Sequence, residues 1–359
     1  MDDVLSSAES GAYTREPLRF TGRGGEYFQI WIVNLLLTIV TFGIYSAWAK
    51  VRRLQYFYRH TELAGSTFDF HGNPVKILIG RIAALVMLGV YNYSVRLQSW
   101  LTIVVVALVA ALLPWLLRNS LRFRLYNTSW RGARFHFRGS VGGAYRVFLL
   151  YGILSFLSLG MLVPFEHQRL KAYQHGNSWF GRAQFSFHAG VGKFYRAYLI
   201  ILAGLVLFGV VVGMAGIGSV LGALLPQKAG GPVANPKAVL AAVGLLWGGG
   251  ILIALAIGPL FHAMITNLIW SNTRLGPHRI ECHVSTPRLM WITVSNFVLV
   301  VVTLGFFMPW AKVRMARFLI EAITLLPVSD LQEFVDSEPE SIEAFGEETA
   351  SIFDVDIAL

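Results

Sequence analysis

Long runs of apolar residues alternate with short, polar, glycine-containing segments along this chain. Four runs approach the roughly 20 apolar residues that a membrane-spanning helix needs, and three more have a similar length. The first four are 77–93, 100–117, 196–221 and 238–259, and the other three are 28–47, 144–163 and 289–308. Apolar residues make up 55% of the sequence, charged residues only 14%, and the mean hydropathy is +0.56. We therefore expect a membrane protein.

The last three of these runs belong to one segment that the chain uses three times. Trp48-Ala49-Lys50-Val51-Arg52 returns as Trp310-Ala311-Lys312-Val313-Arg314 after a shift of 262 residues. A weaker copy lies 117 residues after the first, where Gly160 matches Gly43. The copies occupy residues 18–62, 135–179 and 280–324. This internal identity indicates duplication.

Each copy has the same internal pattern. It opens with period-two alternation, which predicts a short strand. These strands are expected at Leu18-Arg19-Phe20, Phe135-His136-Phe137 and Ile280-Glu281-Cys282. An apolar segment, a glycine and a basic aromatic stretch follow, and we interpret the last as an amphipathic helix at the lipid headgroups.

A smaller repeat lies between the copies. An Asn-Thr-like pair precedes a glycine and then a second alternating stretch, which predicts a turn with positive φ followed by a half-buried strand. The glycines of the four predicted hairpins are Gly65, Gly132, Gly181 and Gly276.

The predicted fold is an α-helical polytopic membrane protein with internally repeated apolar segments and short β-hairpins on the cytoplasmic face. Helix pairs 73–118 and 191–260 join the copies into a membrane domain of residues 18–324, between a polar tail at 1–17 and an acidic tail at 325–359. If all strand-like pieces lie on one side, we expect them to pair into a small sheet.

The distribution of basic residues separates two topologies. Seven single spans would place 12 and 18 lysines and arginines on the two faces. If the triplicated segments re-enter or lie in the interface, only the four paired helices cross, and the split becomes 27 to 3. The positive-inside rule favours the second arrangement.

Localisation follows from the same pattern. The first 26 residues lack the apolar core of a signal peptide, so we expect the first membrane segment to act as an uncleaved anchor. The bacterial inner membrane is the expected location, with a cytoplasmic C-terminal tail. Eleven of the 20 acidic residues lie after Phe318, where we expect either a solvated tail or one that docks on a basic face.

The sequence carries no specific catalytic motif, and we expect no enzymatic activity and no cofactor. His71, His188 and His283 occupy equivalent hairpin positions, but Arg138 fills the fourth, which favours a polar surface position over a metal site. Basic charge that follows the positive-inside rule does not require a nucleic-acid partner.

Two sets of residues are candidates for binding. Basic-aromatic edges suit anionic lipid headgroups or act only as anchors for topology; they comprise Trp48, Lys50, Arg52, Arg53, Trp310, Lys312, Arg314 and Arg317. Polar residues inside the apolar segments form the second set. Asn34 and Asn296 either join helices or contact a ligand. Thr41 and Thr303 are most simply hydroxyls that cap the helix or bond back to it near the glycine.

Two stretches share a motif, Gly43-Ile-Tyr-Ser-Ala-Trp-Ala-Lys-Val-Arg and Gly305-Phe-Phe-Met-Pro-Trp-Ala-Lys-Val-Arg, and the hairpins carry the pattern Asn-Thr-x-x-x-Gly. With these motifs the chain resembles the YjgN-like bacterial inner-membrane proteins. The resemblance covers roughly residues 15–324. It implies a multi-pass inner-membrane protein of unknown function and suggests a membrane metallopeptidase as a partner. The middle copy departs from the motif at Phe165-Glu166-His167.

Two functions remain open at this stage. The first is a non-enzymatic membrane scaffold or modulator that acts on a membrane partner or on lipid. The alternative is a transporter or channel for a lipid or small solute, since broken, repeated apolar segments are how transporters build their binding sites.

Overall fold

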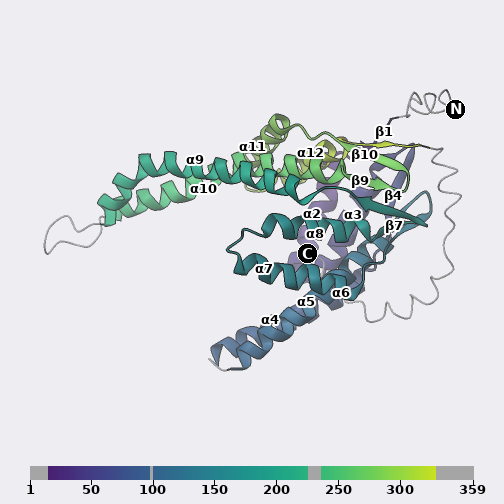
Figure 1. The fold of residues 1–359 in the computed structure, drawn as a ribbon, viewed down its shortest axis with the longest axis horizontal. Coiled ribbons are helices and arrows are strands. Elements are labelled where there is room, and N and C mark those ends of the chain that lie inside the picture. Colours follow the sequence, from purple (N-terminus) through teal and green to yellow (C-terminus); the bar gives the residue numbers. More distant parts are fainter. Residues whose placement is uncertain (1–14, 98–99, 225–235, 329–359) are drawn as a thin grey trace.

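The computed structural model describes residues 15–97, 100–224 and 236–328, and its strands form a single antiparallel sheet (Figure 1). The strand order is β1-β11-β10-β9-β8-β7-β6-β5-β4-β3-β2. The two outer strands, β1 (Glu16–Pro17) and β2 (Arg19–Phe20), are separated only by Leu18. The Leu18 amide donates to the carbonyl of Ile323 at 3.0 Å. The chain itself therefore closes the sheet into a ring.

The ring consists of five strand–helix–helix–strand units in which the two strands pair with each other. The first unit comprises β2, α2 (Gly24–Val40), α3 (Ser46–Arg59) and β3 (Thr61–Leu63), and the second comprises β4 (Ser66–Phe70), α4 (Pro74–Arg96), α5 (Leu101–Tyr126) and β5 (Thr128–Trp130). The third comprises β6 (Ala133–Phe137), a first arm built from α6 (Val141–Ala144), η1 (Tyr145–Leu150) and α7 (Tyr151–Leu157), then α8 (Val163–Gly176) and β7 (Ser178–Phe180). The fourth comprises β8 (Ala183–Phe187), α9 (Val191–Leu224), α10 (Pro236–Trp270) and β9 (Thr273–Leu275), and the fifth comprises β10 (His278–Cys282), α11 (Thr286–Val302), α12 (Met308–Ile320) and β11 (Ile323–Leu326).

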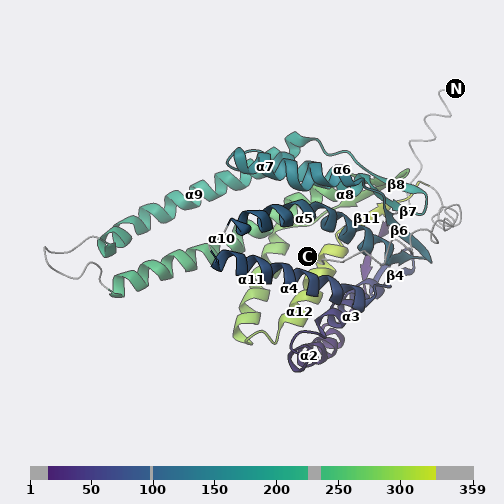
Figure 2. The same ribbon diagram turned by 90° about the horizontal axis from the view of Figure 1, so that it is seen from below.

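All five helical hairpins leave the same end of the ring (Figures 1 and 2). Tight turns at the opposite end connect successive units. The second arm of each hairpin packs against the first arm of the next, and α12 packs against α2 where the ring closes. The helices thus follow the same circular order as the strands.

Aromatic side chains fill the inside of the ring. Successive side chains along each strand point alternately into and out of the ring, so the inward side chains of all strands form a shared apolar core. Phe180 is fully buried, with its ring 4.8 Å from Phe135 and 5.7 Å from Trp130. Leu63, Ile280 and Leu325 complete the buried centre from other strands.

Three of the hairpins are short and have apolar tips. Each tip is a pair of residues with positive φ, the second of which is glycine: Phe42-Gly43, Leu159-Gly160 and Leu304-Gly305. The first residue of each pair is 97%, 94% and 90% exposed, respectively. A 17-residue arm such as α2 is about 25 Å long, which is less than the roughly 30 Å of a hydrocarbon core.

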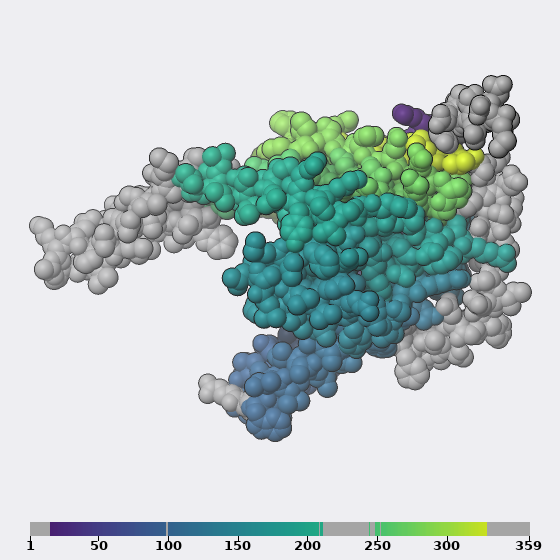
Figure 3. Space-filling model, in the orientation of Figure 1, coloured from purple at the N-terminus to yellow at the C-terminus, as the bar shows by residue number. Residues whose placement is uncertain are grey.

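The other two hairpins are longer (Figure 3). Among the described residues, three helical stretches are long and apolar enough to cross a membrane, namely Pro74–Arg96, Leu101–Tyr126 and Gly248–Trp270. The end of α4 carries Asn92 and Arg96 together with exposed Tyr93. This tip is polar and aromatic, unlike the three short ones.

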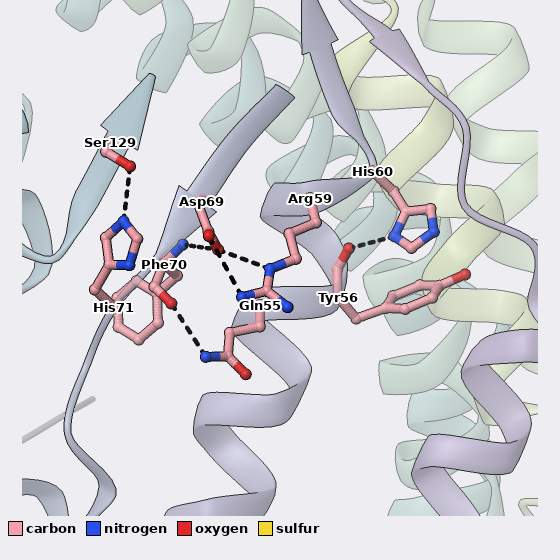
Figure 4. Close-up of polar contacts among 8 residues, drawn as sticks. All are labelled: Gln55, Tyr56, Arg59, His60, Asp69, Phe70, His71 and Ser129. Atoms are coloured by element: carbon pink, nitrogen blue, oxygen red, sulfur yellow. Dashed lines mark hydrogen bonds and ion pairs between the residues drawn. The ribbon is translucent and has the colours of Figure 1, made fainter. Parts of the chain in front are cut away.

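Side chains join each unit to the next at the point where a strand passes into a helix (Figure 4). At all five joints a residue on the second arm donates a hydrogen bond to a backbone carbonyl of the following unit. These bonds are Gln55 Nε2 to Phe70 O (3.2 Å), Arg118 Nε to Gly139 O (2.7 Å), Gln168 Nε2 to Ala189 O (3.0 Å), Asn267 Nδ2 to Val284 O (3.1 Å) and Arg317 Nη2 to Gly22 O (2.8 Å). Arg59 and Asp69 add an ion pair at the first of these joints, with 2.8 Å between Nε and Oδ1.

Gly139 gives a direct test of how closely these joints are packed. A Cβ there would lie 2.6 Å from ring atoms of Phe137 and 2.6 Å from Oη of Tyr173. We expect Gly139→Ala to lower the free energy of unfolding by about 1–3 kcal/mol, measured by thermal unfolding of the purified protein. Gly142→Ala, where a Cβ meets nothing within 4 Å, is the control and should be neutral or stabilising. Equal effects of the two changes would contradict the close packing.

The structure corrects the predicted fold class. A purely α-helical polytopic fold is wrong, because the strands, which we expected at most to pair into a small sheet, form one 11-stranded ring. The strands themselves and the glycine turns are confirmed, with φ of 75°, 82°, 56° and 53° at the four hairpin glycines. The smaller repeat corresponds to the joints between units. Its asparagines, Asn127, Asn177 and Asn272, each donate a hydrogen bond to the carbonyl four residues earlier and end a helix.

Two further expectations change. The helix pairs are not linkers between copies but the hairpins of the second and fourth units. The basic aromatic helix of the first copy, α3, does not lie flat beside the ring. It returns along α2, and the strand that follows it pairs with the strand that precedes α2. The domain boundary predicted at residue 324 falls inside β11, and the part of the acidic tail beyond 328 lies outside the described residues.

Candidate functional site

The basic-aromatic stretches of the first and last copies come together where the ring closes. Helix α3 carries the first stretch and α12 the second, and both pack against α2. Residues that are 262 positions apart in the sequence therefore flank one helix. We call this region the closing seam, defined by Tyr27, Arg53, Tyr56, Lys312 and Arg317.

The two repeated tryptophans have the same structural role. Trp310 stacks on Phe28 of α2, with ring centroids 4.8 Å apart, and a Cβ at Gly24 would lie 2.2 Å from its ring. Trp48 packs against the buried cluster between α3 and α4, which includes Ile77. Each tryptophan thus anchors a second arm to the next unit.

The rings of Tyr27 and Tyr56 pack together, with centroids 5.2 Å apart. Arg53 acts electrostatically on Tyr27 and on Lys312, and Arg317 acts on Tyr56. Burial raises the pKa of Tyr27, and Arg53 acts in the opposite direction. Arg317 donates to the carbonyl of Gly22 and still leaves its charge beside Tyr56.

Tyr56 connects α3 to the residue that precedes α2 within the closing seam. Its hydroxyl donates to the carbonyl of Arg23 and accepts from the amide of the same residue, both at 2.8 Å. Burial raises the pKa of Tyr56 to about 12, so it remains a neutral donor. Glu26 supplies one carboxylate, 3.8 Å from Nε2 of His60. Positive charge remains in excess, which suits an anionic phosphate group.

The other predicted basic residues lie outside this cluster. Arg52 is exposed and donates to the hydroxyl of Tyr45 at 3.1 Å. Arg314 binds Ser295 Oγ at 2.8 Å and Asn296 Oδ1 at 3.4 Å, which ties α12 to α11. Lys50 is half-buried in α3.

Three of the four polar candidates in the apolar segments bond within their own hairpins. Asn296 donates from Nδ2 to the carbonyl of Ala311 at 3.2 Å, so it joins the two arms. Asn34 is buried, and its Oδ1 has no hydrogen-bond partner among the described residues. Thr41 and Thr303 each donate to the carbonyl four residues earlier and accept from the amide four residues later. Their hydroxyls close the turn at the hairpin tip.

Reasoning from sequence missed part of the seam. Tyr56 was visible only as one aromatic residue in a basic stretch, and Tyr27 stood in an apolar run without a motif. The contact from Arg317 to Gly22 spans 295 residues, and no local pattern encodes it. The matching Tyr173, whose hydroxyl donates to the carbonyl of Ser140 at 2.9 Å, was the available signal that this tyrosine position is structural.

Comparison with known proteins identifies the family of this chain and supports a membrane location. A family described as "Bacterial protein of unknown function (DUF898)" matches residues 15–352. The chain belongs to this family. It is 24% identical over 379 residues to a protein of Salmonella typhimurium named "Inner membrane protein YjgN", and the match covers 94% of each chain.

A second relative shows the same name. The "Inner membrane protein YjgN" of Escherichia coli K12 is 30% identical over 159 residues, which cover 43% of this chain and 39% of that protein. No solved structure matches the chain.

Proposed function

We propose that this protein is a bacterial inner-membrane protein that inserts its five hairpins into the bilayer from the cytoplasmic side. It acts there as a non-enzymatic scaffold or modulator of lipid or of a membrane partner. The naming of its relatives as inner membrane proteins supports the location. The single observation that carries the rest is that all the hairpins leave one end of a closed ring.

Charge supports the orientation. Of the 29 basic residues that the structure describes, 27 lie in the ring or on hairpin arms nearer to it, and two, Arg96 and Lys237, lie toward the far ends of the long hairpins. Lys228 falls in the sequence between α9 and α10, outside the described residues. By the positive-inside rule, this distribution of charge supports a cytoplasmic ring. Both tails also start from the ring and share that side.

Hairpin length and tip chemistry support an effect on lipid. The long α4–α5 hairpin ends in tyrosine, asparagine and arginine, which suit the far headgroup region. The short hairpins end in Phe42, Leu159 and Leu304 without a charged residue at the tip, which suits the hydrocarbon interior. Helices shorter than the bilayer thickness cause thinning or tilt around them. Three such hairpins beside two spanning ones would deform the bilayer locally.

The filled ring favours a scaffold over the alternative of a transporter or channel. A path along the ring axis would have to pass Phe180, Trp130 and Phe135, which pack against one another. A metallopeptidase partner, suggested by the family resemblance, remains a prediction.

Anionic lipid at the closing seam is the most specific part of this function. After purification in mild detergent, we expect native mass spectrometry to find phosphatidylglycerol or cardiolipin retained in preference to phosphatidylethanolamine. Arg53→Gln combined with Lys312→Gln should reduce that retention about thirtyfold, because each of the two basic residues near a lipid surface contributes about 1 kcal/mol. Arg279→Gln, on the outer face of the sheet, is the matched control.

Unchanged retention of anionic lipid by the double variant would contradict a lipid site at the closing seam. Retention of a small solute in place of lipid, lost on substitution of Asn34, would instead favour the transporter.

A further inference from the structure

Two arginines face each other across neighbouring strands on the outside of the ring. Arg274 of β9 and Arg279 of β10 are direct cross-strand partners, and both are exposed. Like charges in this position destabilise a strand pair. Glu281, on the same face of β10, lies 4.0 Å from His283 instead. Within the described ranges, neither arginine forms an ion pair, so the repulsion has no visible compensation there.

The C-terminal segment starts beside this arginine pair. Leu326 of β11 is the cross-strand partner of Arg279, and the amide of Val328 donates to Nδ1 of His278 at 3.1 Å. This is the end of the ring opposite to the helices. Residues 329–359 follow and lie outside the described ranges. Their sequence contains ten acidic residues and no lysine or arginine.

Reach and charge both fit an intramolecular contact. Asp330 is four residues beyond Leu326, a span of up to about 14 Å in an extended chain. Strand β9 lies two strands from β11, about 10 Å away. Without this segment, the chain has 30 basic and 10 acidic residues. A tethered segment also has an effective concentration in the millimolar range, which favours it over a free anionic partner.

We propose that the acidic segment 329–359 docks on the outer face of β9 and β10, with its first carboxylates, from Asp330 and Glu333, around Arg274 and Arg279. The docked segment covers the basic face of the ring at its cytoplasmic end. The contact does not depend on the proposed lipid site, which lies on the helices.

Zero-length carbodiimide cross-linking of the full chain tests the contact directly. Arg274→Lys and Arg279→Lys keep the charge and supply an amine. We expect mass spectrometry to find bonds from these positions to Asp330 or Glu333. Arg52→Lys, on a helical arm, should form no bond to the segment. If the sheet variants give no such bond and the segment couples elsewhere, the proposal is overturned.

A rate measurement gives a second, independent test. Cleavage after Glu333 by a Glu-specific protease should be slow in the parent at low salt. Arg274→Gln with Arg279→Gln should speed it about fivefold to tenfold, as expected for losing two exposed ion pairs. Raising the salt concentration to 0.5 M should bring the parent to a similar rate. Equal rates in parent and variant at low salt would show that the arginine pair does not hold the segment.

Discussion

Replacing Phe180 with alanine is expected to lower the free energy of unfolding by about 3–5 kcal/mol, the usual cost of removing a large aromatic side chain from a core. Phe180 has no exposed surface and contacts aromatic rings of two other strands. Because the ring positions all five hairpins, we expect its loss to destabilise the whole fold. Thermal and denaturant unfolding of the purified protein would measure the effect.

Trp179 provides the matched control on the same strand. It points to the outer face, is only partly buried, and its ring lies under the guanidinium of Arg138 at 4.7 Å. Trp179→Ala should therefore cost much less than Phe180→Ala. If the two substitutions cost the same, the ring interior is not the stabilising core.

A lysine at the tip of a short hairpin is expected to be costly in a membrane. Leu159→Lys and Leu304→Lys each place a charge where we expect hydrocarbon, at about 2.5–3.5 kcal/mol on the insertion scale. The backbone at both positions has positive φ in the parent, so exchanging one non-glycine residue for another leaves the conformational cost unchanged. The amount of folded protein recovered from membranes would measure the loss of insertion. The double variant should give less folded protein than either single variant.

Tyr93→Lys is the control for this experiment. Tyr93 is 66% exposed near the tip of the long α4–α5 hairpin, close to Arg96. A lysine there should be accepted, since this tip lies at the far headgroups. Equal tolerance at all three positions would contradict a hydrocarbon location for the short tips.

Local patterns in the sequence predicted the local structure well. Alternation located the strands around Phe135 and Ile280, glycine located the turns, and Thr41 and Thr303 were expected to bond back to the helix. Each of these features depends on a few adjacent residues and on steric rules for the backbone.

The ring could not be predicted in this way. Its strands are two to five residues long, and closure depends on pairing residue 17 with residue 324. The second and fourth units also escaped recognition as copies, because their helices have lengthened and only the joint residues remain alike. Asn127 and Asn177 end helices of 26 and 14 residues with the same hydrogen bond.

The measurement that tests the central claim most directly is the side of the membrane on which each joint lies. Reporter fusions after Glu62, Gln98, His175, Gly230 and Leu325 sample both ends of the hairpins. Single cysteines at the same positions can be labelled as a check. Burial raises the pKa of the native Cys282 thiol to about 11, so it should stay unlabelled near neutral pH. A ring with inserted hairpins predicts positions 62, 175 and 325 in the cytoplasm and positions 98 and 230 outside. Finding 62 and 175 on opposite sides would contradict it.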